Sequence, residues 1–257
     1  MAVPGRRVPD NVPAALADTE LFAVDAYQRE FEAAVTDVDH DQGRVALRRT
    51  VFFPGGGGQP HDLGRLSWSD GGAAVSKVAR DRETGIIWHW LDGEHRPDPG
   101  TELYGMLDWD RRHLTMRTHT ALHILCGVIW SEFGLAVTGG NMEPGKGRLD
   151  FPFESMSVEL GQQVEHRINE EIDAAREILV DFVGRKVADE DAALIRTAAN
   201  LIPREIDPLR VIDIVGLDKQ ADGGTHVLTT AEVGRVVVTG TESKGKGNKR
   251  IRLEVRD

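Results

Sequence analysis

The apolar pattern of the chain changes near Asp110, and this change limits the possible folds more than any other feature of the sequence. Before Asp110, short runs of β-branched and aromatic residues alternate with clusters of Gly, Pro and Asp, as in a small antiparallel sheet or barrel. After it, apolar residues recur at helical spacing as far as Phe133, and Gly134 is a suitable helix stop. The pattern predicts an α+β protein.

The expected domain boundaries follow from this change. Residues 1–18 contain three prolines and are expected to form a flexible lead-in. Residues 19–109 are expected to form a small, β-barrel-like module that includes a glycine-rich motif. Residues 110–257 are expected to form an α+β domain in which long helices pack on an antiparallel sheet.

Composition excludes some classes of protein. The chain has 257 residues, of which 40% are hydrophobic and 28% are charged, so wholesale disorder is not expected. No apolar run approaches the length needed to cross a bilayer, so we expect no membrane partner. The single cysteine, Cys126, excludes an internal disulfide framework and is compatible with a cytoplasmic protein. The oligomeric state stays open, and a monomer is compatible with the sequence.

The net charge of −11 does not exclude a nucleic-acid partner, because binding depends on the local field and the charges are unevenly distributed. Basic residues gather at 244–252 and 111–117, whereas acidic residues gather at 18–32 and 165–173. Each basic run, taken alone, is also compatible with a solvated surface. Composition therefore does not identify the partner.

Two short motifs contain residue types that bind metal ions. His119 and His123 are four residues apart in the expected helix, and this spacing places both imidazoles on one face, although such pairs also occur by chance. Asp222 and His226 flank the flexible sequence Gly-Gly-Thr, which lets both side chains face one point. The four residues would form a tetrahedral zinc site with one ion per chain. Alternatively, three of them bind the ion and the fourth position stays open for water or substrate.

Four separated motifs resemble the signature of alanyl-tRNA editing domains. They are FFPGGGGQP (52–60), DWDRRHLTMRTHTALH (108–123), GGTHV (223–227) and SKGKG (243–247), in the family's order. Such domains occur inside alanyl-tRNA synthetase and as free-standing AlaX-type proteins, and threonyl-tRNA synthetase carries a related domain. The resemblance implies a zinc-dependent trans-editing hydrolase that deacylates tRNA(Ala) carrying the wrong amino acid. The sequence leaves open whether that amino acid is serine, glycine or both.

One position departs from the family's pattern. The second metal motif of the family usually begins with Cys, and this chain has Asp222 there. Asp222 is expected to bind the ion directly, as a harder ligand than thiolate and with weaker affinity for zinc. Two alternatives stay open: Asp222 orients a His or a bound water, or the site has lost its metal. Cys126 is a candidate replacement thiolate, although the role of a small buried apolar residue explains it more simply.

The resemblance also implies roles for other residues. An ion held by His119, His123 and His226 would activate water or polarise the ester carbonyl, so His119 and His123 are the expected catalytic residues. The expected substrate-binding residues are Thr50, Gly56, Gly57, Gly58 and Gln59. The expected tRNA-binding residues are Arg111, Arg112, Lys244, Lys246, Lys249 and Arg250. By themselves, the glycines are equally compatible with a tight strand connection.

Two other functions compete with editing. One is a tRNA-binding module with a metal-free site, which the Asp at position 222 favours. The other is a metallohydrolase that acts on a small-molecule ester, against which the glycine-rich module and the basic tail argue. Metal analysis of the protein would distinguish the metal-free module from an editing enzyme. Deacylation assays on aminoacyl-tRNA would distinguish an editing enzyme from a small-ester hydrolase.

Overall fold

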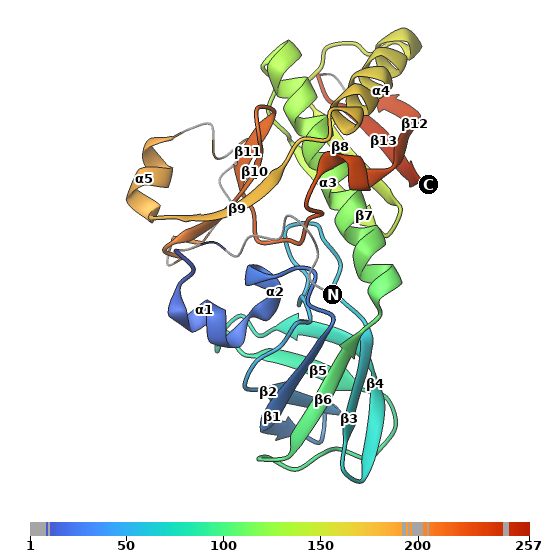
Figure 1. The fold of residues 1–257 in the computed structure, drawn as a ribbon. Coiled ribbons are helices and arrows are strands. Elements are labelled where there is room, and N and C mark those ends of the chain that lie inside the picture. Colours follow the sequence, from blue (N-terminus) through green and yellow to red (C-terminus); the bar gives the residue numbers. More distant parts are fainter. Residues whose placement is uncertain are drawn as a thin grey trace. The chain divides into compact units, whose positions relative to one another are not determined.

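The computed structural model describes residues 9, 11–191, 194, 196, 203–204, 206–243 and 247–257. These residues form two compact units, of which one is Val12–His113 and the other is Leu114–Asp257 together with the described residues up to Asn11. Figure 1 shows a mixed α+β fold, and this confirms the class expected from the sequence.

The unit Val12–His113 is built on a closed antiparallel barrel, drawn at the bottom of Figure 1. Around the barrel the strands follow the order β1-β2-β5-β4-β3-β6. Their bounds are β1 Glu30–Asp39, β2 Arg44–Leu47, β3 Gly64–Trp68, β4 Gly71–Arg80, β5 Ile87–Leu91 and β6 Glu102–Leu107. Exposed and buried residues alternate along the whole of β6, and apolar side chains such as Phe52 and Leu66 fill the core. The predicted β-barrel-like module is confirmed.

Part of the expected flexible lead-in is helical. Ala14–Thr19 forms α1 and Leu21–Val24 forms α2. The amide of Leu21 donates to the carbonyl of Thr50 (3.0 Å), and the amide of Thr50 donates to the carbonyl of Thr19 (2.9 Å). These bonds attach the helical segment to the chain just before the glycine-rich motif, so residues 14–18 are part of the folded unit.

The unit Leu114–Asp257 contains two antiparallel sheets and the longer helices. One sheet has the order β12-β13-β8-β7 and the other has the order β11-β10-β9. The strand bounds are β7 Gly139–Glu143, β8 Lys146–Phe151, β9 Ile178–Val183, β10 Leu209–Ile214, β11 Asp218–Ala221, β12 Arg235–Ser243 and β13 Lys249–Arg256. The helix bounds are α3 Trp109–Phe133, which belongs to this unit from Leu114 onward, α4 Val158–Asp173, α5 Arg185–Glu190 and the 3-10 helix η2 Thr230–Val233.

Helix α4 packs on the four-stranded sheet. The side-chain amide of Asn169 donates to the carbonyl of Val236 in β12 (2.8 Å), and its oxygen accepts from the amide of the same residue (3.0 Å). Apolar residues such as Val164 and Ile168 are buried on the same helix. The expected packing of a long helix on an antiparallel sheet is confirmed.

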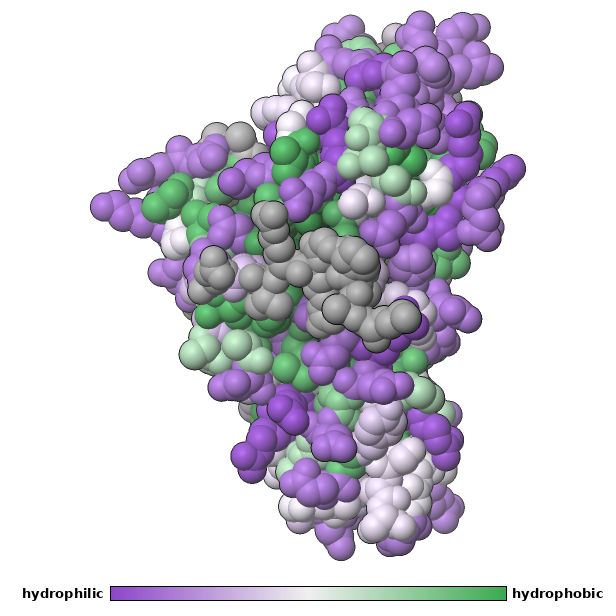
Figure 2. Space-filling model, in the orientation of Figure 1, coloured by the Kyte–Doolittle hydropathy of each residue, from purple (hydrophilic) through white to green (hydrophobic). Residues whose placement is uncertain are grey.

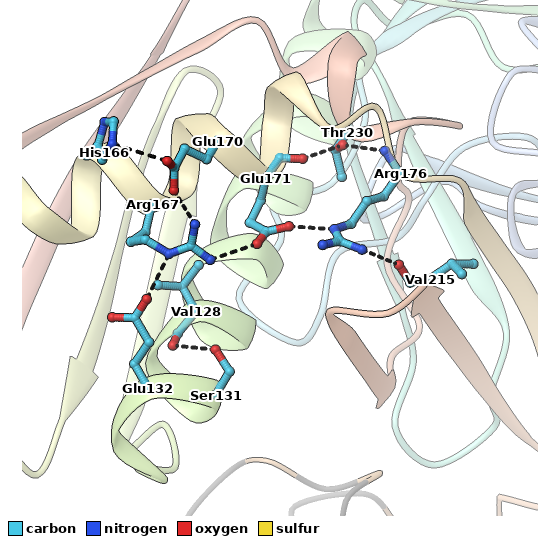
Figure 3. Close-up of polar contacts among 10 residues, drawn as sticks. All are labelled: Val128, Ser131, Glu132, His166, Arg167, Glu170, Glu171, Arg176, Val215 and Thr230. Carbon is cyan, nitrogen blue, oxygen red and sulfur yellow. Dashed lines mark hydrogen bonds and ion pairs between the residues drawn. The ribbon is translucent and has the colours of Figure 1, made fainter.

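An ion-pair network connects α3, α4 and the turn after β10 (Figure 3). Arg167 of α4 donates to Glu132 of α3 (2.9 Å) and to one oxygen of Glu171 (3.0 Å). The other oxygen of Glu171 accepts from Arg176 (2.5 Å), which also donates to the carbonyl of Val215 in the β10–β11 turn (3.1 Å). The network therefore links the helix and the hairpin that carry the candidate site.

Hydrophilic side chains cover most of the face drawn in Figure 2, and apolar side chains occupy separate areas between them. Helix α3 has 25 residues, but it begins with Trp109, Asp110 and two arginines. Within the part of the chain that the structure describes, no helix combines the length and the apolar character needed to span a bilayer.

Candidate metal centre

Four side chains of the types that bind metal ions come together in the unit Leu114–Asp257. His119 and His123 lie one turn apart on α3, and Asp222 and His226 lie on the segment that follows β11. One ligand atom from each residue lies within 4.8 Å of the others. The ring centroids of His119 and His226 are 4.3 Å apart, and that of His123 is 5.0 and 4.7 Å from them, respectively.

The donor set suits a divalent cation such as zinc. Three imidazoles and one carboxylate match the nitrogen and oxygen ligands of tetrahedral zinc sites, in which bonds of about 2.0–2.1 Å place the ligand atoms about 3.4 Å apart. The Asp222 carboxylate lies 3.1 Å from Nε2 of His226 and 3.7 Å from Nε2 of His119. Small side-chain movements would therefore complete the coordination, and this cluster could bind a metal ion.

A short turn brings Asp222 and His226 to the same place. The carboxylate of Asp222 accepts a hydrogen bond from the amide of Gly224 (2.7 Å), which closes the turn. Arg210 of β10 donates to the carbonyls of Asp222 (3.0 Å) and Gly224 (2.7 Å) and so fixes the turn to the neighbouring strand. On the helix side, the hydroxyl of Thr120 lies 3.1 Å from Nδ1 of His226, so the Nε2 atom of this ring faces Asp222.

The electrostatics of the site favour the protonation states that bind metal. Burial lowers the pKa of His119 to about 4, and burial together with the neighbouring His119 holds the pKa of His226 well below its ordinary value. Burial opposes ionisation of Asp222, but the adjacent imidazoles outweigh it and hold the pKa of this carboxyl well below its usual range. Near pH 7, His119 and His226 are therefore neutral and Asp222 is a carboxylate, which are the forms of these groups that bind metal.

His123 differs from the other two histidines. Burial alone would lower its pKa, but the hydrogen bond and the charge of Asp218 outweigh burial and raise the pKa of His123 above its ordinary value. Asp218, Arg210 and Thr120 were not singled out from the sequence. None of them stands out in its segment of the sequence, and only the residues that face each one in the fold reveal its role.

Cys126 lies outside this cluster. It is buried, and burial raises the pKa of its thiol. Its Sγ atom accepts a hydrogen bond from the side chain of Gln220 (3.3 Å). The ligand group found among the described residues consists of the three histidines and Asp222, so the cysteine is not part of it.

The expected substrate-binding residues belong to the other unit, Val12–His113. Gly56 and Gln59 exchange two backbone hydrogen bonds (3.0 and 2.9 Å) around a tight turn, and all four glycines, 55–58, have positive φ values of 58–137°. The hydroxyl of Thr50 lies 2.9 Å from Nε2 of the buried His89 and accepts from the amide of Phe52 (3.0 Å). The turn explains the glycines, and the contact of these residues with substrate stays a prediction.

The structure changes the expectation for the basic residues. Arg112 is fully buried and pairs with Asp62, so it has no exposed donor for a phosphate, and the expected tRNA contact of this residue is withdrawn. Arg250 donates to both oxygens of Asp150 (2.7 and 2.8 Å), and Lys249 is largely buried. Arg111 is partly exposed. Lys244 and Lys246 lie outside the described residues.

Along most of its length, the chain is similar in sequence to alanyl-tRNA editing proteins and to part of alanine–tRNA ligases. The family described as "Threonyl and Alanyl tRNA synthetase second additional domain" matches residues 209–252. "Alanyl-tRNA editing protein AlaX-M" of Methanosarcina barkeri is 36% identical over 234 residues, which make up 90% of this chain and 96% of that protein. AlaX-M of Saccharolobus solfataricus is 36% identical over 240 residues, or 92% and 98% of the two chains. "Alanine--tRNA ligase" of Methanococcus vannielii is 32% identical over 240 residues, which cover 92% of this chain but 26% of the ligase.

Proposed function

The chain belongs to the family of free-standing alanyl-tRNA editing proteins, and we propose that it removes serine, and also glycine, from mischarged tRNA(Ala) by metal-assisted ester hydrolysis. The observation that carries the proposal is the convergence of three histidines and Asp222 in a chain that matches AlaX-M proteins along nearly their whole length. The protein would act in the cytoplasm on tRNA that a synthetase has already released.

The metal in this proposal is one zinc ion per chain, held by His119, His123, His226 and Asp222. Zinc would supply a Lewis acid for the ester carbonyl and lower the pKa of a water molecule. The protein would hold His119 and His226 neutral, and it would exclude bulk solvent because all three histidines are buried. A carboxylate in place of the family's usual thiolate would make the site harder, and its affinity for zinc weaker.

Selection of serine against alanine requires a polar group that pairs with the serine hydroxyl. We assign this role to Thr50, by its resemblance to the family's position before the glycine-rich loop. A hydroxyl oxygen has one donor and two acceptor sites. Donation to His89 and acceptance from the Phe52 amide would leave one lone pair on Thr50, and a serine hydroxyl would donate to it. The amides of Gly56, Gly57 and Gly58 and the side chain of Gln59 would hold the rest of the aminoacyl group.

The tRNA would be held through its phosphates by Lys244, Lys246, Lys249, Arg250 and Arg111. Such contacts release counterions from the nucleic acid, so affinity should fall steeply as the salt concentration rises. A salt-independent affinity would argue against this assignment. Arg250 would have to exchange part of its pairing with Asp150 for a phosphate contact.

The test is a deacylation assay on seryl-, glycyl- and alanyl-tRNA(Ala). Each substrate is assayed with the untreated protein, with the protein after metal chelation, and with the chelated protein after zinc is added back. We expect release of serine and glycine but little release of alanine, loss of activity on chelation, and recovery with zinc. His119→Ala should be inactive, and His166→Ala is the matched control because that histidine is exposed on α4.

Binding of tRNA without cleavage by the zinc-loaded protein would favour a binding module instead. Cleavage of small esters but not of aminoacyl-tRNA would favour the second alternative.

A further inference from the structure

We infer that Asp218 is a positioning residue for the proposed metal centre, since its carboxylate holds the Nδ1–H group of His123 and thereby directs Nε2 of that ring toward the ion. The inference rests on the proposed function, because it assigns a task to a residue beside the proposed ligands. Asp218 is the first residue of β11, four positions before Asp222.

The contact is short and buried. Oδ2 of Asp218 lies 3.0 Å from Nδ1 of His123, and the two residues are 2% and 8% exposed. A neutral imidazole carries one proton, and a hydrogen bond to a carboxylate places this proton on the nitrogen that faces the carboxylate. The second nitrogen then carries the lone pair that a metal needs. Residues that orient metal-binding histidines in this way raise metal affinity.

Asp218 is itself held from two further sides. Arg196 donates to Oδ1 (2.6 Å), and the side-chain amide of Gln220 donates to Oδ2 (2.7 Å), the oxygen that faces His123. Arg196 supplies the opposite charge that a buried carboxylate requires. Because both oxygens of Asp218 are engaged, its carboxylate plane is fixed, and so is the direction of its bond to His123.

Helix α3 has a glycine, Gly127, where the residues at the start of β11 approach it. Gly127 lies one turn after His123, and a Cβ atom there would stand 2.8 Å from the side chain of Leu217 and 3.1 Å from Cβ of Asp218. A larger residue would push the start of β11 away from the helix. The close approach of β11 at Gly127 therefore sets the distance between Asp218 and His123.

A purely structural ion pair between Asp218 and Arg196 is the competing explanation. It would account for the burial of both charges, but it would not require a bond to His123. The two explanations differ in what happens to metal affinity and to the His123 ring when the carboxylate becomes an amide. Asp218→Asn keeps the size of the side chain but loses its charge, and its NH2 group must face either Arg196 or the pair His123 and Gln220, so one of these sides loses its acceptor.

The experiment compares Asp218→Asn with Asp213→Asn. Asp213 lies on the same hairpin, and its Oδ2 atom is 3.7 Å from Nζ of Lys219. Asp213→Asn therefore controls for the loss of a negative charge. Zinc affinity of the folded proteins is measured by competition with a chromophoric chelator. We expect Asp218→Asn to bind zinc about 10–100-fold more weakly, as is typical for residues that orient ligands, and Asp213→Asn to bind it like the wild type.

A second measurement needs no variant. In metal-free wild-type protein at pH 9, nitrogen NMR of the ring should show the His123 proton on Nδ1. Protonation on Nε2, or zinc affinity of folded Asp218→Asn within about twofold of the wild type, would overturn the inference while leaving the proposed function intact. If the wild type binds no zinc, the proposed function fails first, and the role assigned to Asp218 fails with it.

Discussion

The guanidinium of Arg112, at the start of α3, lies fully buried against the carboxylate of Asp62, which is 50 positions earlier in the chain. Its Nε atom donates to both oxygens of Asp62 (2.9 and 3.0 Å), and one of its Nη atoms pairs with Oδ2. The remaining donors bond the carbonyls of Ala26 (2.9 Å) and Val51 (2.6 Å). One side chain thus joins three segments of the unit Val12–His113, including the segment just before the glycine-rich motif.

Arg112→Met should destabilise the protein by about 3–5 kcal/mol, because it leaves Asp62 as a buried charge without its partner. Urea unfolding of this unit, followed by tryptophan fluorescence, measures the effect. Arg111→Met is the matched control because Arg111 is partly exposed. We expect this variant to unfold like the wild type. Equal stability of the two variants would show that the Arg112–Asp62 pair does not hold the unit together.

Asp222→Ala should weaken zinc binding by more than the factor of about 10–100 that is typical for residues that only orient a ligand. The reason is that the variant removes one of the four donors of the cluster. Asp222→Cys should restore zinc binding at least to the wild-type level, because thiolate is a softer ligand for zinc. A modest loss in the Ala variant would instead identify Asp222 as a residue that orients His226 or a bound water.

Thr50→Val should cost about 1–3 kcal/mol of stability, because it leaves the buried Nε2 of His89 and the amide of Phe52 without their shared partner. It should also reduce the preference for seryl over alanyl ester. Thr50→Ser keeps the hydroxyl and is the control in both measurements. Unchanged preference in the Val variant would remove Thr50 from the substrate site, whatever its effect on stability.

The stability of the barrel unit should depend on pH through His89. Burial lowers the pKa of His89 to about 4, below the value of about 6.5 expected in the unfolded chain. Protonation therefore favours the unfolded state, so the contribution is complete above about pH 6.5 and is lost as the pH falls toward 4. Between pH 7 and pH 5 the loss should be about 2 kcal/mol.

The measurement compares unfolding of the wild type and of His89→Gln at both pH values. Other titrating groups are common to the two proteins, so they cancel in the difference. The variant should lack the additional loss at pH 5. A parallel decline of the two proteins would mean that His89 is not held neutral inside the barrel.

The fold class was accessible from the sequence because periodicity is a local property. Alternating burial in a strand such as β6 and the helical spacing that reaches Phe133 appear directly in the order of residues. The spacing of His119 and His123 likewise follows from one helical turn. The helix at residues 14–19 was not predicted, because the end of this segment is held by backbone bonds of Thr19 and Leu21 to Thr50, which no local pattern records.

The surroundings of the candidate site could not be predicted in this way. Arg111 and Arg112 are adjacent and chemically alike, yet Arg112 is fully buried against Asp62 whereas Arg111 is partly exposed. In β10, Arg210 and Asp213 both interrupt an apolar run, but Arg210 fixes the turn that carries Asp222. Such differences arise from the residues on other segments that each side chain faces, and a single sequence does not contain these pairings explicitly.

The most direct test of the central claim is the zinc X-ray absorption spectrum of the reconstituted protein. If the three histidines and Asp222 hold the ion, the protein should retain one zinc per chain by elemental analysis, and the spectrum should show nitrogen and oxygen ligands at about 2.0–2.1 Å and no sulfur ligand. A protein that retains no zinc, or a sulfur ligand at about 2.3 Å, which only Cys126 or a methionine of this chain would provide, would contradict the claim.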